Sequence, residues 1–252
     1  MTEQQLVDRL RAAGCVFAED EARVLLESAS SGAELGAMTA RRVAGEPLEY
    51  VVGWAEFCGL RIAVSPGVFI PRARTEYLVA LAAQLTLAQG VVVDLCCGTG
   101  ALGLALAASV PGIELHASDI DPAAVACARA NGVDARLGDL FDALPVRLRG
   151  HVDVLLANTP YVPTAELGLL PREARLYEAA VTLDGGTDGL DLQRRVAAGA
   201  PLWLAPGGVV LVEASQRQAP ASAAIFAAAG LDVDVHHDEH RDATVVVGRR
   251  PR

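Results

Sequence analysis

The stretch that decides the fold is residues 91–100, VVVDLCCGTG. Its first five residues are apolar except for Asp94, a pattern typical of a buried strand in a parallel sheet. Gly98 and Gly100 follow where the strand gives way to an Ala- and Leu-rich helix, so a ligand can approach the backbone there beside the positive end of the helix. With Gly103 they spell G-x-G-x-x-G, which is also the dinucleotide fingerprint and a weak signal alone. The run predicts an α/β fold with a ligand site at this turn.

Two acids indicate which ligand is expected. Asp94 lies just inside the strand end, where a carboxylate would crowd a pyrophosphate but suits a cation, such as the ammonium group of S-adenosylmethionine. Asp119 directly follows the next predicted strand, residues 113–118. An acid at this position typically binds ribose hydroxyls, both of dinucleotides and of S-adenosylmethionine, so it does not distinguish between them. We interpret Cys96 and Cys97 as small packing residues rather than nucleophiles.

The rest of the chain continues the alternation of strand and helix. Apolar runs predict further strands over residues 133–137, 152–157, 209–213, 231–235 and 244–247, the last two as a closing hairpin. Helices are expected from Glu76 to about Gln89, after Gly100, from Asp121-Pro122, and over residues 190–204 and 218–229. Pro206-Gly207-Gly208 is expected to form a turn.

The chain before this domain divides into two shorter parts. Residues 1–45 predict a small helical module, and that length is too short for a core of its own, so we expect the module to dock on the catalytic domain or on a partner. Residues 46–71 read as short strand-like pieces, which predicts a β-hairpin linker. The catalytic domain is then expected over residues 72–252.

The stretch most informative about chemistry is residues 158–163, NTPYVP, directly after the apolar run 152–157. The side-chain oxygen of Asn158 and the backbone carbonyl of Thr159, held by Pro160, are two pre-placed acceptors for the hydrogens of a planar amide or amine. Tyr161 is expected to stack on such a flat group. This arrangement favours methyl transfer to a planar nitrogen, and the alternative is an ordinary strand-to-loop exit.

Other candidate site features are less specific. Residues 164–190 read as a loop long enough to act as a lid or a substrate contact. The backbone around Leu140 is either an adenine-binding turn or a simple apolar turn. Arg72 and Glu76 are equally compatible with a site and with a solvated surface. The histidines at 236, 237 and 240 fall in the presumed last turn, and we favour a solvated polar turn there over a metal site.

Composition excludes several classes of protein. The chain has 252 residues, 52% hydrophobic, with net charge −10 and arginine as its only basic residue apart from histidine. It has no basic run of the kind that follows a phosphate backbone, which argues against stable nucleic-acid binding. The five cysteines include no C-x-x-C pair, so neither a disulfide framework nor a zinc site is indicated. Neither a signal segment nor a membrane-spanning run is evident, and we expect a cytoplasmic protein without membrane partners.

The motifs together resemble one family. Residues 46–50 (EPLEY), 70–76 (IPRARTE) and Asn158-x-Pro160-Tyr161 occur in the order typical of the protein-(glutamine-N5) methyltransferases of the HemK/PrmC type. The resemblance implies a class I, Rossmann-like, seven-stranded fold that uses S-adenosylmethionine. It implies that cofactor-binding residues include Cys96, Cys97, Gly98, Thr99, Gly100, Asp119, Leu140 and Asn158. Residues 158–161 would then bind the side-chain amide of a glutamine in a protein such as a class I peptide release factor, giving N5-methylglutamine.

The chain departs from the family pattern at several positions. Cys96 stands where a glycine is usual, Arg74 where an acid is usual, and Thr159 where the first proline is usual, and the N-terminal module is shorter. These departures suggest a divergent paralogue. They keep three alternatives open: an N6-adenine nucleic-acid methyltransferase, a small-molecule N-methyltransferase, and a catalytically weak interaction module. A nucleic-acid methyltransferase would need to flip the target adenine out of a duplex.

Overall fold

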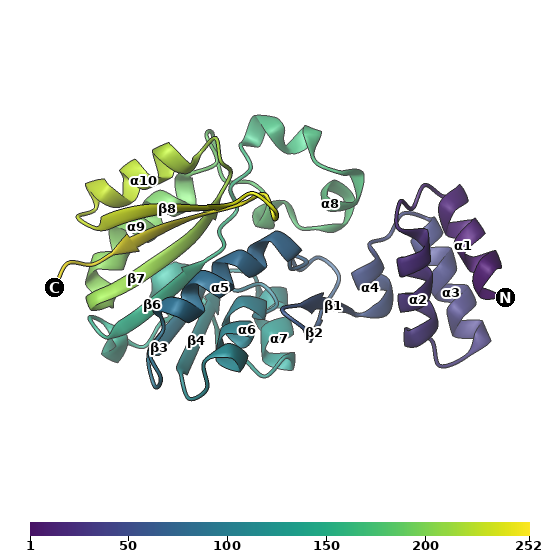
Figure 1. Ribbon diagram of the computed structural model, residues 1–252, viewed down its shortest axis with the longest axis horizontal. Coiled ribbons are helices and arrows are strands. Elements are labelled where there is room, and N and C mark those ends of the chain that lie inside the picture. The colour runs from purple at the N-terminus through teal and green to yellow at the C-terminus, as the bar shows by residue number, and fades with distance from the viewer.

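The computed structural model describes all 252 residues and has a central seven-stranded sheet with helices on both faces (Figure 1). The strand order is β5-β4-β3-β6-β7-β9-β8, and the last two strands in this order run antiparallel to their neighbours. The strands are β3 (Val91–Leu95), β4 (Glu114–Asp119), β5 (Ala135–Leu137), β6 (Val152–Ala157), β7 (Leu204–Ala214), β8 (Asp232–Asp238) and β9 (Ala243–Arg249). The predicted seven-stranded α/β fold is therefore confirmed.

Alternation along the buried strands explains why the sheet carries helices on both faces. In β6, Val154 and Leu156 pack on one face while Leu155 and Ala157 pack on the other, because successive side chains of a strand point in opposite directions. The first face is covered by α5 (Glu76–Leu85) and α6 (Ala101–Ser109), with α7 (Pro122–Ala130) beside them. The second is covered by α9 (Asp191–Trp203) and α10 (Ala219–Ala228).

The register of the three central strands assembles the site. Leu95 of β3 pairs with Ser118 of β4 and with Ala157 of β6, and all three strands are parallel. The turns that leave their carboxyl ends therefore lie side by side at one edge of the sheet, where open α/β sheets bind ligands. The glycine turn, Asp119 and Asn158 meet there although they are separated in the sequence.

The N-terminal helices α1 (Glu3–Ala12), α2 (Ala18–Ser28) and α3 (Gly32–Val43) lie apart from the sheet and are joined to it through α4 (Leu48–Val52), as Figure 1 shows. Contrary to expectation, these helices enclose an apolar cluster of nine buried residues, to which α4 contributes Val51. An additional link to the catalytic part is the buried Arg42, which donates to Glu21 of α2 and to Glu173 of α8 (Arg172–Tyr177), each at 2.6 Å.

The predicted hairpin is β1 (Trp54–Phe57) paired with β2 (Leu60–Ala63), although the residues before it form the helix α4 rather than strand-like pieces. Asn131, at the end of α7, connects the hairpin to the glycine turn. Its side chain pairs with the backbone N–H and carbonyl of Ala63 at 2.8 and 2.9 Å and donates to the carbonyl of Thr99 at 3.0 Å. The hairpin is therefore fixed against the site rather than being a free linker.

Four local expectations were wrong. The segment 164–190 contains α8 and the 3-10 turns η4 (Thr164–Leu169) and η5 (Ala180–Thr182) instead of one loop. Helix α5 ends at Leu85 because the chain becomes extended at Thr86. Residues 206–208 form an irregularity within β7 rather than a turn before it, with Gly207 at φ +82°. His236 and His237 belong to β8, because they continue its pairing with β9.

Short 3-10 turns also occur at η1 (Ala73–Thr75), η2 (Leu140–Ala143) and η3 (Val146–Leu148).

Candidate active site

A cavity of about 510 Å³ lies at the carboxyl edge of the central strands. Its walls include all but two of the sequence-predicted site residues, namely Cys96, Cys97, Gly98, Thr99, Asp119, Leu140, Asn158, Thr159, Pro160 and Tyr161. The two exceptions are Asp94 and Gly100, of which Gly100 is the N-cap of α6. We call the side formed by the glycine turn, Asp119 and Leu140 the cofactor half. The side formed by residues 158–161, with the arginines and glutamates around them, is the acceptor half.

The backbone of the glycine turn adopts a conformation that is unfavourable for residues with a side chain. Cys96, Gly98 and Gly100 have φ values of +54°, +54° and +78°, a region that favours glycine. A Cβ at Gly98 would meet no atom within 4 Å, so its backbone faces open space, whereas one at Gly100 would meet Val133 at 2.7 Å. Cys96 therefore adopts a strained conformation at the position where the resemblance expects glycine. Burial raises the pKa of both the Cys96 and Cys97 thiols, which keeps them protonated and agrees with a packing role.

Asp119 joins the glycine turn to the neighbouring strand. One carboxylate oxygen accepts from the N–H of Gly98 and the other from the N–H of Asp121, each at 2.9 Å. Burial raises the pKa of this carboxyl, because the two backbone bonds offset only part of the cost of desolvating its charge. A ligand that brings hydroxyl donors or positive charge to this half would lower that cost.

The structure does not bring Asp94 to the cavity wall. Its side chain is 1% exposed and accepts from the N–H of Gly103 at 3.0 Å, in the first turn of α6. Burial raises the pKa of Asp94 to about 8, with Asp119 adding to the rise. Asp94 therefore fixes the helix that follows the glycine turn and does not contact the cavity.

Leu140 contributes its backbone to the cofactor half. It has a φ of +48°, and its carbonyl accepts from the hydroxyl of Ser118 at 2.8 Å, which ties η2 to the end of β4. The side chain is 6% exposed and lines the cavity. This arrangement gives an apolar surface beside Asp119, and it fits the flat base and ribose of a nucleoside cofactor.

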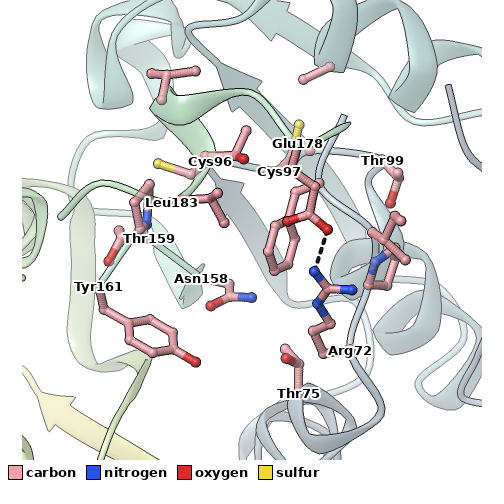
Figure 2. Close-up of a pocket in the computed structure, with 18 of the residues that line it drawn as sticks. Arg72, Thr75, Cys96, Cys97, Thr99, Asn158, Thr159, Tyr161, Glu178 and Leu183 are labelled. Atoms are coloured by element: carbon pink, nitrogen blue, oxygen red, sulfur yellow. Dashed lines mark hydrogen bonds and ion pairs between the residues drawn. The ribbon is translucent and has the colours of Figure 1, made fainter. Parts of the chain in front are cut away.

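The acceptor half presents unused hydrogen-bonding groups. Figure 2 shows the side-chain amide of Asn158 pointing into the cavity between Tyr161 and Arg72, with no hydrogen bond to the other residues drawn. Beside it, the hydroxyl of Thr159 is buried and has no hydrogen-bond partner. Buried polar groups are normally paired, so the unpaired hydroxyl of Thr159 indicates that a ligand can supply a missing partner beside the half-buried Asn158.

Tyr161 is held by a network that the sequence reasoning missed. Its hydroxyl donates to Glu213 at 2.7 Å and accepts from Arg74 at 2.5 Å, while Arg74 also donates to Glu213 at 3.0 Å. Thr75 donates to the second oxygen of Glu213 at 2.6 Å. Burial beside Glu213 raises the pKa of Tyr161, so the phenol stays protonated. The acid at the end of the apolar strand 209–213 was the one available signal for this network.

A second ion pair lines the acceptor half. Arg72 donates to Glu178, which is 6% exposed and whose other carboxylate oxygen has no partner (Figure 2). Burial raises the pKa of Glu178, although Arg72 opposes the rise. Arg72 is therefore part of the cavity wall, whereas Glu76 accepts from the N–H of Cys58 at 2.8 Å and fixes the hairpin instead. No sequence pattern had singled out Glu178 as a partner of Arg72.

The structure contains no group of three or more His, Cys, Asp or Glu side chains arranged to hold a metal ion. None of its helices combines the length and the apolar character needed to span a membrane.

Comparison with known proteins gives a consistent result. Residues 59–186 match the methyltransferase small domain family. A release factor glutamine methyltransferase from Geobacter sulfurreducens is 37% identical over 219 residues, covering 84% of this chain and 76% of that protein. One from Bradyrhizobium diazoefficiens is 36% identical over 257 residues, covering 91% and 86%. A solved methyltransferase from Pyrococcus furiosus shares the fold with a TM-score of 0.58 at 17% identity, covering 86% of this chain and 100% of that one.

Proposed function

We propose that this chain, which belongs to the release factor glutamine methyltransferase family, methylates the side-chain amide nitrogen of a glutamine in a peptide chain release factor. The observation that carries the proposal is the side-chain amide of Asn158, which has no hydrogen-bond partner in the protein and lines the cavity three residues before a fixed tyrosine ring. A release factor substrate would put the enzyme in the cytoplasm, where translation ends.

The cofactor is S-adenosylmethionine, and the residues of the cofactor half fit it. Gly98 offers open backbone, Asp119 offers carboxylate oxygens for ribose hydroxyls, and Leu140 offers an apolar wall. When bound, this cofactor supplies a methyl group on a positively charged sulfur, which makes the methyl electrophilic.

The acceptor half supplies what a glutamine amide needs. An amide nitrogen is a poor nucleophile because its lone pair is delocalised into the carbonyl group. The side-chain oxygen of Asn158 and the backbone carbonyl of Thr159 would accept its two hydrogens, which favours a pyramidal nitrogen with a localised lone pair. The nitrogen then exchanges one hydrogen for the methyl group and releases it as a proton. The ring of Tyr161, fixed by Glu213 and Arg74, gives the flat amide a surface to stack on.

The test is intact-mass analysis of a release factor incubated with this protein and S-adenosylmethionine, followed by peptide mapping. We expect the factor to gain the mass of one methyl group on a glutamine. Asn158→Ala should abolish the gain. Gln84→Ala, which removes an exposed amide on α5, is the matched control and should leave the gain unchanged. A release factor that stays unmodified while the protein binds S-adenosylmethionine would contradict the proposed substrate.

A further inference from the structure

A second cavity, of about 390 Å³, lies against the acceptor half. The two cavities share five wall residues, Arg74, Tyr161, Val162, Leu170 and Pro171. The second cavity continues between η4 and the turn that follows β7, where Glu166 and Arg217 form an exposed ion pair at 2.6 Å. The active-site cavity therefore does not end at Tyr161, because an open space continues on the other side of its ring.

The partition between the cavities is rigid. Glu213 is 2% exposed and receives hydrogen bonds from Arg74, Thr75 and Tyr161. The backbone carbonyl of Tyr161 in turn accepts from Gln218 at 2.9 Å. Both the ring and the backbone of Tyr161 are thus fixed.

The second cavity presents groups that match an extended polypeptide. Arg74 uses its Nε and Nη2 atoms within the network, whereas its Nη1 has no partner in the protein. Gln216 is exposed and its amide, a donor and an acceptor, makes no hydrogen bond in the protein. Leu169 is 83% exposed, although it is a large apolar residue. A donor, an acceptor and an apolar side chain therefore all line the second cavity.

We propose that the second cavity binds the stretch of substrate polypeptide that flanks the target glutamine. This inference rests on the proposed function. A glutamine side chain can fill the first cavity only if its own backbone stays near the mouth, and that backbone carries alternating N–H and C=O groups that need partners once they leave water. Arg74 Nη1 would donate a hydrogen bond to a backbone carbonyl, Gln216 would pair with a neighbouring peptide group, and Leu169 would cover an apolar side chain. Only the contact with Leu169 would depend on which side chain flanks the glutamine, because the other two are made to backbone groups.

The experiment measures steady-state methylation of an intact release factor by the full-length protein and three variants. Leu169→Asp places a charge in the second cavity, and we expect KM for the release factor to rise about tenfold while kcat changes less than about twofold. Gln216→Ala should raise KM about threefold. Leu176→Asp is the matched control, because Leu176 is also exposed, at 59%, in the same segment but lines neither cavity. Affinity for S-adenosylmethionine and the unfolding midpoint should be the same in all four proteins.

The outcomes separate the two proposals. Normal methylation with an unchanged KM in both Leu169→Asp and Gln216→Ala would overturn the flanking-polypeptide site and leave the proposed function intact. Equal rises in KM for Leu169→Asp and Leu176→Asp would also overturn it, because the effect would then come from charge in the segment. A wild-type protein that adds no methyl group to the release factor would overturn the proposed function, and this inference with it.

Discussion

Two carboxylates at the cofactor half are paired only with backbone N–H groups, whereas the two buried glutamates of the acceptor half are paired with arginines. Asp94 and Asp119 accept from Gly103, Gly98 and Asp121. Glu178 and Glu213 instead have Arg72 and Arg74 as partners. Asp94, with a pKa of about 8, is mostly protonated at neutral pH, so the carboxylate without an arginine partner at the cofactor half is that of Asp119, which suits a cationic sulfonium. The glutamates of the acceptor half are neutralised by arginines, which suits an uncharged amide.

The largest effect is expected from removing the side-chain amide of Asn158, which has no hydrogen-bond partner in the protein, from the acceptor half. Asn158→Ala should lower kcat by about 100-fold or more, the size seen when one preorganised polar group is lost from a reaction site. The unfolding midpoint should stay unchanged, because this side chain bonds to nothing in the protein. Single-turnover methylation and thermal unfolding measure the two quantities. A loss below about threefold would show that this half does not act through Asn158.

The next largest effect is expected from reversing a charge in the acceptor half. Arg74→Asp places a carboxylate beside the buried Glu213 and releases Tyr161, so we expect the free energy of unfolding to fall by about 2 kcal/mol and kcat to fall about tenfold. Arg74→Lys is the matched control, since it keeps the charge but loses the planar fork, and its losses should be about half as large. Denaturant unfolding and steady-state kinetics test this. Equal stability of wild type and Arg74→Asp would mean that the pairing contributes nothing.

A substitution in the cofactor half is expected to have a smaller effect, and to change cofactor affinity rather than kcat. Asp119→Asn removes negative charge that favours a cationic cofactor and weakens the acceptor of ribose hydroxyls, so affinity for S-adenosylmethionine should fall about tenfold. At saturating cofactor, kcat should be nearly normal. Calorimetry with S-adenosylmethionine and kinetics at saturation separate binding from turnover. A fall in kcat with unchanged affinity would reverse the roles assigned to the two halves.

The smallest effect is a dependence of stability on pH. The pKa of Asp94 is about 8 in the folded protein and near 4 in an unfolded chain, so the folded state holds more protons between these values. The free energy of unfolding should therefore fall as pH rises, by about 1 kcal/mol between pH 7 and 8. Asp94→Asn keeps an oxygen for the N–H of Gly103 and should remove this fall. Asp8→Asn, at an exposed position, should not. Urea unfolding at the two pH values measures the difference.

The sequence by itself determined the strands, the glycine turn and the family. Apolar runs such as residues 91–95 and 152–157 carry their own strand signal, and parallel strands bring their carboxyl ends to one edge whatever lies between them. Asp119 and Asn158 could therefore be placed in one site before any coordinates. The residue-by-residue roles within that site, and the division into module, hairpin and catalytic domain, stay predictions.

Only the tertiary structure decided which charges meet. Arg72 and Glu178 are 106 residues apart, and Arg74 and Glu213 are 139 apart, so no local pattern links them. The structure also turned Asp94 towards α6 rather than into the cavity and placed α8 where a loop was expected. Local periodicity follows from the geometry of the backbone, which the sequence carries at each residue. Pairing between distant side chains depends on which groups the sheet and its loops bury together, and that arrangement exists only in the folded chain.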